Sequence, residues 1–97
     1  MVKFVYFGFD VFAPCLERLL NEGHELVHLF SFFTDNTHDF NQRVINMAVG
    51  RDVPVSFHKP RKEELADLYE KYDAVFISAG YAYKIPPLPD KARGMNV

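Results

Sequence analysis

Short apolar segments alternate with helix-like segments along almost the whole chain. Four segments are rich in β-branched and aromatic residues and are as short as buried strands: Val2–Gly8, Glu25–Phe33, Val53–Phe57 and Asp73–Gly80. The stretches between them carry apolar residues three and four positions apart, which is typical of one helix face. This alternation predicts an α/β domain with a parallel sheet and right-handed crossovers.

Each intervening stretch also has signals for the ends of a helix. The expected helix faces are Phe12, Cys15, Leu16, Leu19 and Leu20; Phe40, Val44, Met47 and Ala48; and Leu65, Leu68, Tyr69 and Tyr72. Asp10 precedes the first helix as its expected N-cap, and Gly23 ends it. Gly50 closes the second helix, and Pro60 opens the third.

A proline-rich loop, "YAYKIPPLPDKARG", follows the fourth strand and leads into the start of a fifth. We predict a doubly wound, Rossmann-like parallel sheet in the order 3-2-1-4-5, truncated at strand five, with strand three at an edge and the first two helices on opposite faces. The chain direction reverses between strands one and four. A ligand crevice is therefore expected at their carboxyl ends, lined by Gly8–Phe12 and Gly80–Leu88 with Asn96 nearby.

The composition limits the class of protein. The 97 residues suffice for one domain, and the net charge of -2 gives no basic surface for DNA. The chain has no apolar stretch of the roughly 20 residues that a membrane span needs, no signal peptide ahead of the first strand, and a single cysteine. We therefore expect a cytoplasmic protein without a DNA or membrane partner.

The sequence lacks the motifs of several common binding sites. The first strand-to-helix turn reads "GFDVFA", with one glycine where a dinucleotide site needs G-x-G-x-x-G, and no phosphate-binding loop sequence occurs. Asp10 stands without the second carboxylate that a phosphoacceptor domain needs for Mg²⁺. The four histidines lack zinc-ligand spacing, so they are expected at the surface or in turns, and no metal site is predicted: His24, His28, His38 and His58.

Five stretches resemble the folate-dependent formyltransferases, the family of methionyl-tRNA formyltransferase and the nucleotide-sugar N-formyltransferases. "FVYFGFDVFAPCLERLLNEGHELV" is similar to their F-G-x-x-x-F-A opening, the L-x-x-L-L helix and G-H-E-[LV]-V. "YDAVFISAGYAYKIP" is similar to P-D-[LV]-x-[VF]-x-x-A-Y-G-x-I-L-P, while "FTDN" and "RDVPV" fall where the family has [FT]-x-x-D and G-I-P-V. The final "GMNV" resembles the start of [GC]-x-[IMF]-N-[VL]-H-x-S-L-L-P.

The resemblance implies transfer of a formyl group from 10-formyltetrahydrofolate to a primary amine. It implies that Asn96 is catalytic, as a donor to the developing oxyanion, and that Gly8, Phe9 and Asp10 form a substrate-side turn. The residues implied to bind the folate are Tyr81, Ala82, Tyr83, Lys84, Ile85, Pro86 and Leu88.

The family's catalytic His and Asp and its S-L-L-P segment have no counterpart in residues 1–97. The chain is therefore expected to be the amino-terminal part of a formyltransferase domain, inactive alone, with an exposed sheet that allows a homodimer. Ala82, Tyr83 and Lys84 depart from the Y-G-Q-I-L-P of methionyl-tRNA formyltransferases, while "FTDN" and the loop without that Gly are closer to the branch that formylates amino-sugars on nucleotides.

Two alternatives remain open at this point. One is a non-catalytic ligand-binding or interaction domain that keeps the same sheet. The other is hydrolysis of formyltetrahydrofolate, which uses the same groups with water in place of the amine.

Overall fold

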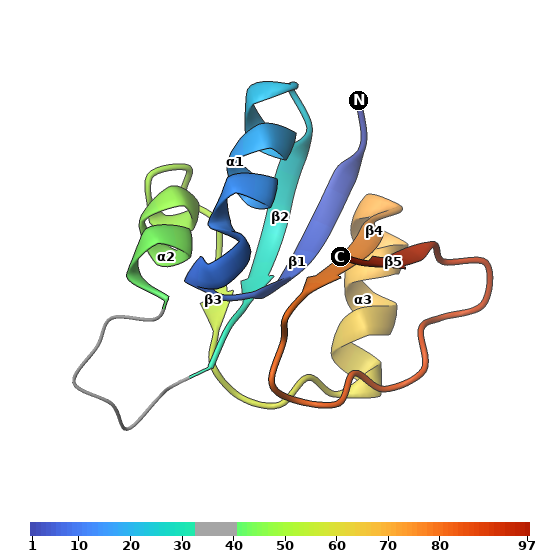
Figure 1. The fold of residues 1–97 in the computed structure, drawn as a ribbon. Helices are drawn as coiled ribbons and strands as arrows, with labels where there is room; N and C mark the ends of the chain where they lie inside the picture. The colour runs from blue at the N-terminus through green and yellow to red at the C-terminus, as the bar shows by residue number, and fades with distance from the viewer. Residues whose placement is uncertain (33–40) are drawn as a thin grey trace.

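The computed structural model describes residues 1–32 and 41–97. Along the chain the elements are β1 (Lys3–Gly8), η1 (Asp10–Phe12), α1 (Ala13–Asn21), β2 (Glu25–Phe30), α2 (Gln42–Val49), β3 (Val55–Ser56), α3 (Lys62–Tyr72), β4 (Val75–Ala79) and β5 (Gly94–Asn96) (Figure 1). His38, Phe40 and the whole of "FTDN", residues 33–36, lie outside the described residues.

The strands form one sheet in which every pair is parallel. Their order is β3-β2-β1-β4-β5, which confirms the predicted α/β class and doubly wound, Rossmann-like topology. β1 lies at the centre and pairs with β2 on one side and with β4 on the other. The carboxyl ends of all five strands therefore lie at the same edge of the sheet.

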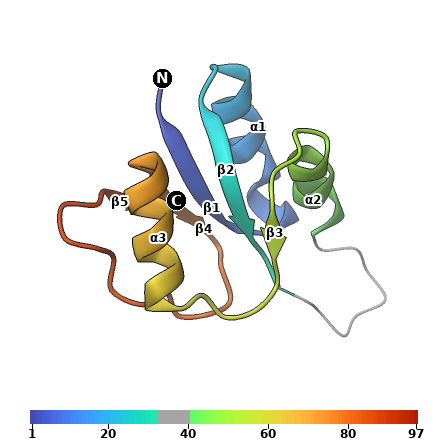
Figure 2. The same cartoon turned by 180° about the vertical axis from the view of Figure 1, so that it is seen from behind.

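The helices form two unequal layers. α1 and α2 pack on one face, while α3 covers the other (Figures 1 and 2). The prediction that the first two helices lie on opposite faces was wrong. From β1 through β2 to β3 the chain moves across the sheet in one direction, so two right-handed crossovers place both helices on the same side. The crossover from β3 to β4 runs back in the other direction, and α3 therefore lies on the opposite face.

β1 supplies side chains to the hydrophobic core on each side of the sheet. Phe4 and Tyr6 belong to the core beneath α1 and α2, while Val5 and Phe7 belong to the core beneath α3. All four side chains are fully buried. Burying one large apolar side chain stabilises a fold by about 1.5–3 kcal/mol. Because the four side chains are divided between the two cores, β1 stabilises the packing of helices on both faces of the sheet.

The end of α1 follows from its sequence. The Gly23 N–H donates to the Leu20 carbonyl, and the His24 N–H donates to the Leu19 carbonyl, so the helix closes with two bonds of the Schellman type. Gly23 has a φ of 91°, a conformation that costs other residues free energy. Gly23 therefore ends the helix as the sequence predicted.

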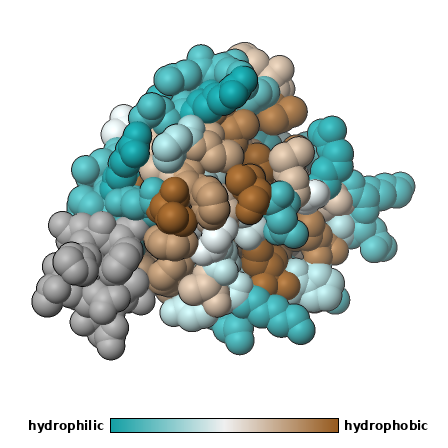
Figure 3. All heavy atoms as spheres, in the orientation of Figure 1, coloured by the Kyte–Doolittle hydropathy of each residue, from teal (hydrophilic) through white to brown (hydrophobic). Residues whose placement is uncertain are grey.

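Exposed apolar side chains gather on the face that α1 and α2 only partly cover. In the view of Figure 1, brown residues occupy the middle of the molecule between η1 and β5 (Figure 3). Val11 and Phe12 of η1 and Met95 and Val97 at β5 are all exposed. β5 also ends the sheet, with an outer edge to which the described strands offer no partner. A homodimer through this part of the sheet stays a prediction.

No helix in residues 1–32 or 41–97 is long and apolar enough to cross a membrane.

Asp10 does not cap α1, contrary to the sequence prediction. It lies in η1, and α1 begins after Phe12 without a side-chain cap. The Asp10 carboxylate instead accepts hydrogen bonds from the backbone N–H groups of Arg43 and Val44, each at 3.0 Å. These are free donors in the first turn of α2, at the positive end of its dipole. Asp10 therefore joins the β1–α1 turn to the second helix.

Asp10→Ala should lower the free energy of unfolding by about 1 kcal/mol, because two helix N–H groups lose their acceptor. Asp10→Asn keeps one side-chain acceptor and should cost less. Urea denaturation followed by circular dichroism measures both, with the exposed Asp67→Ala as the control for loss of one negative charge. An Asp10→Ala variant as stable as the control would contradict the capping role.

Candidate functional site

A pocket of about 370 Å³ opens at the carboxyl ends of β4 and β5, on the face that α3 covers. Its lining residues are Phe7, Phe76, Ser78, Ile85, Pro86, Pro87, Leu88, Gly94, Met95 and Asn96. They come from β1, β4, β5 and the proline-rich loop, which lie together although the loop and β1 are far apart in sequence. The pocket is large enough for a small organic ligand.

The sheet and the loop form different walls of this pocket. Phe7 and Phe76 of the α3-side core form the floor, and the loop residues Ile85 and Leu88 pack against that core. Ser78 and Asn96 are aligned partners in the β4–β5 pairing, so their side chains leave the sheet on the same face. The result is an apolar slot with a hydroxyl and an amide at one end.

Gly94 allows the loop to close over the sheet. A Cβ atom at this position would lie 2.6 Å from Leu88 Cδ1 and 3.5 Å from the Phe76 carbonyl oxygen. A side chain at residue 94 would therefore have to displace Leu88, which is part of the pocket wall.

The residues expected to bind folate lie in three different places. Ile85, Pro86 and Leu88 line the pocket together with Asn96. Lys84 lies next to it and lines a smaller hollow with Pro86. The other three do not line the pocket: Tyr81 is half-buried, while Ala82 and Tyr83 are exposed.

The expected substrate-side turn lies apart from this pocket. Gly8 is buried where β1 meets β4, and Phe9 packs on Phe32 with ring centroids 5.1 Å apart. Asp10 is bonded to α2. None of the three lines the pocket that holds Asn96. The two segments that were expected to line one crevice therefore do not line the same pocket.

The Tyr81 ring packs among other aromatic side chains at the start of the proline-rich loop. Its ring packs at 5.4 Å from Phe7 and at 5.7 Å from Tyr83, measured between centroids. Within the described residues its buried hydroxyl has no hydrogen-bond partner, and burial raises the pKa of this phenol above its usual range. Tyr81 therefore stays neutral and supports the loop from below.

A cluster of polar side chains that the sequence did not predict lies near the start of α3. His28 Nε2 shares a hydrogen bond of 2.8 Å with Ser56 Oγ, and His58 Nε2 lies 2.7 Å from Glu64 Oε2. The other Glu64 oxygen accepts the Arg61 backbone N–H at 2.9 Å, which caps α3. Both carboxylate oxygens of Glu64 are thus bonded.

The expectation that His28 is a surface or turn residue was also wrong. It lies half-buried in β2, 4.5 Å from the Phe30 ring, and burial lowers the pKa of its imidazole. The pairing register shifts by one residue, since Phe4 aligns with Leu26 but Val5 aligns with His28. Simple alternation from Leu26 would have placed His28 beneath α1 and α2.

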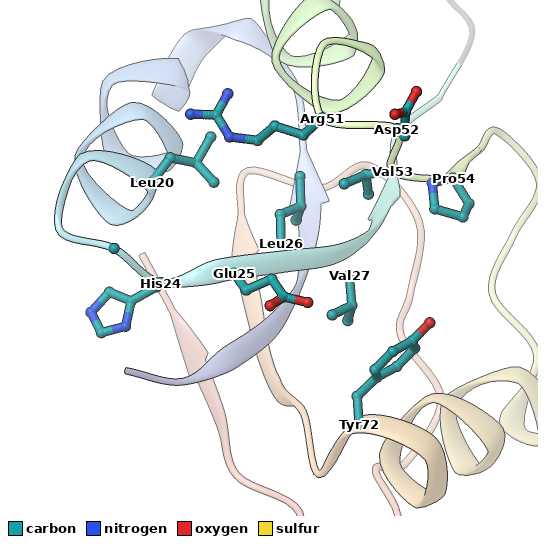
Figure 4. Close-up of a pocket in the computed structure, with 11 residues that line it drawn as sticks. Leu20, His24, Glu25, Leu26, Val27, Arg51, Asp52, Val53, Pro54 and Tyr72 are labelled. Carbon is teal, nitrogen blue, oxygen red and sulfur yellow. The ribbon is translucent and has the colours of Figure 1, made fainter.

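A larger hollow of about 450 Å³ lies at the opposite, amino end of the strands (Figure 4). Glu25, Arg51 and Asp52 border it, with Tyr72 of α3 on its far side. Ligands of open α/β sheets bind at the carboxyl ends instead, so the smaller pocket beside Asn96 is the better candidate site.

Outside residues 33–40, no cluster of three or more His, Cys, Asp or Glu side chains is arranged to hold a metal ion. No protein-family model matches the chain, and the curated proteins searched contain no match to it. What the structure defines is therefore the class, a Rossmann-like α/β domain with a pocket at its carboxyl edge.

Glu64→Gln should destabilise the protein at pH 7 by about 1 kcal/mol. Partial burial raises the pKa of Glu64, but the Arg61 N–H and His58 outweigh it, so the pKa lies below 4.5. A depressed carboxyl pKa stabilises the fold above the unfolded-state pKa, and this contribution disappears as the pH falls through the folded-state pKa. The gap between wild type and variant should therefore narrow from about pH 5 downwards.

Urea denaturation at a series of pH values measures this gap, and the exposed Glu63→Gln in the same helical turn is the control. A gap that stays constant down to pH 2 would show that the Glu64 charge is not what stabilises α3.

Proposed function

We propose that the pocket beside Asn96 binds 10-formyltetrahydrofolate and that the chain is the amino-terminal part of a formyltransferase domain. One observation carries the proposal. Asn96 lines the same pocket as Ile85 and Pro86, and these residues belong to two separate stretches of formyltransferase-like sequence. The pairing of β5 with β4 is what brings the two stretches together.

The walls of the pocket suit the pterin part of a folate. Phe7, Phe76 and Leu88 offer apolar surface to a flat bicyclic ring. The Ser78 hydroxyl offers a polar group that would fix its orientation, and the Asn96 amide is left to face the formyl group. The amide of Asn96 is exposed, so it is accessible to a ligand.

The chemistry of Asn96 follows from its amide. In formyl transfer the amine nitrogen bonds to the formyl carbon, the bond from that carbon to the folate nitrogen breaks, and the carbonyl oxygen gains negative charge on the way. The Asn96 NH₂ group can donate to that oxygen, and it does so without titrating. A base must also take the proton of the amine, and the resemblance assigns this to a His that follows Val97 in the family pattern.

The acceptor we favour is an amino-sugar nucleotide, on the residues at Ala82, Tyr83 and Lys84. Methionyl-tRNA and water are the two other acceptors. A chain that binds folate without any transfer would be the ligand-binding domain considered above. Product analysis with each acceptor separates these four cases.

The chain should bind 10-formyltetrahydrofolate in the pocket, and Ser78→Phe should weaken binding at least about 10-fold by filling the polar end of the pocket with a ring. Ser78→Ala is the matched control, since it removes only the hydroxyl and should change the affinity less than about 5-fold. Isothermal titration calorimetry measures all three proteins, with circular dichroism to confirm that each is folded. No binding by the wild type would refute the folate proposal, and equal binding by Ser78→Phe would place the ligand elsewhere.

In a protein that contains residues 1–97 together with the His and Asp of the family pattern, Asn96→Ala should lower kcat about 100- to 1,000-fold, the usual cost of one oxyanion donor. Affinity for the folate should change little, because the lost hydrogen bond forms mainly in the transition state. Single-turnover kinetics and calorimetry give the two quantities. A variant with wild-type kcat would remove Asn96 from the mechanism.

A further inference from the structure

A second, smaller hollow adjoins the candidate ligand pocket. It has a volume of about 200 Å³ and is lined by Lys59, Pro60, Lys84 and Pro86. Pro86 also lines the larger pocket, so the two hollows share a wall. A ligand longer than the first pocket can therefore continue past Pro86 into the second.

The second hollow is lined by two lysines that form no ion pair in the described structure. Lys59 lies between β3 and α3, and Lys84 lies in the proline-rich loop. Both side chains are exposed, and neither takes part in the ion pairs found among residues 1–32 and 41–97. The carboxylate of Glu64, on the first turn of α3, is already bonded to His58 and Arg61.

The two hollows together are thus apolar at one end and cationic at the other. A neutral ring fits the end beside Phe7 and Phe76, while carboxylates fit the end between the lysines. Folates have this same polarity, because a flat pterin is joined through a benzoyl group to one or more glutamates. The length of such a molecule requires its anionic tail to leave the ring pocket.

We propose that Lys59 and Lys84 bind the glutamate carboxylates of the folate, and that they favour polyglutamate over monoglutamate forms. This inference rests on the proposed function, since it assumes that a folate ring occupies the larger pocket. Each exposed ammonium–carboxylate pair contributes roughly 1.4- to 5-fold in affinity. The contribution of both lysines should weaken as added salt screens these charges.

The test compares pteroic acid, which has no glutamate, with pteroylglutamate and pteroylpentaglutamate by calorimetry at 20 and 300 mM NaCl. At low salt the pentaglutamate should bind on the order of 10-fold more tightly than pteroic acid, and the difference should shrink at high salt. The double variant Lys59→Gln/Lys84→Gln should abolish the difference, and pteroic acid, whose only carboxylate is that of its benzoate, should lose at most about 5-fold in affinity. Lys62→Gln, an exposed lysine at the start of α3 that does not line the hollow, is the control.

The outcomes separate this inference from the proposed function. If pteroic acid and the pentaglutamate bind the wild type equally well, and the double variant also binds them equally well, the ring pocket stands and the tail site is refuted. If none of the three probes binds, the folate proposal fails first and the tail site fails with it. If inorganic pyrophosphate binds at the lysines and the pentaglutamate does not displace it, the cationic hollow serves a phosphate of the acceptor, which also overturns the tail site.

Discussion

β1 and β4 approach each other so closely at their carboxyl ends that only glycine fits at residue 8. A Cβ atom on Gly8 would lie 2.8 Å from the Ala79 carbonyl oxygen, which belongs to the neighbouring backbone and cannot rotate away. This contact marks the point where the chain order of the sheet reverses. With β1 and β4 held together, the right-handed crossovers fix α1 and α2 on one face and α3 on the other. Both cores, and the pocket at the strand ends, depend on that spacing.

The two faces use the carboxyl edge of the sheet differently. On the α1 and α2 face, the Asp10 carboxylate is fully occupied by the first turn of α2. On the α3 face, the proline-rich loop folds back over Phe7 and Phe76 and leaves a slot that ends at Asn96. One turn therefore serves stability, while the loop and β5 provide the binding surface. The sequence analysis assigned both segments to one crevice because the reversal of strand order predicts the edge of the sheet at which a ligand binds and not the face.

Local patterns predicted what depends on neighbours in sequence. Short apolar runs and apolar residues three to four positions apart predicted the order of strands and helices, and Gly23 predicted the end of α1. The errors concern long-range geometry. The cap formed by Asp10 joins residues more than 30 positions apart, and the environment of His28 depends on a shift of one residue in the pairing of β1 with β2. Neither leaves a local pattern, since each forms only when distant segments pack.

The candidate site also has one part that the sequence predicted and one part that depends on how distant segments pack. Sequence placed Asn96 near Ile85, Pro86 and Leu88 because parallel strands end at one edge of a sheet, and the structure brings these four residues into one pocket. It did not place Lys59 beside Lys84, because that proximity depends on how the loop passes the start of α3. The loop can take this path because three prolines stiffen it and because Gly94 leaves room for Leu88 above β5. The rigidity of the loop thus fixes the distance between the apolar and the cationic end, and a ligand that fits must match that distance.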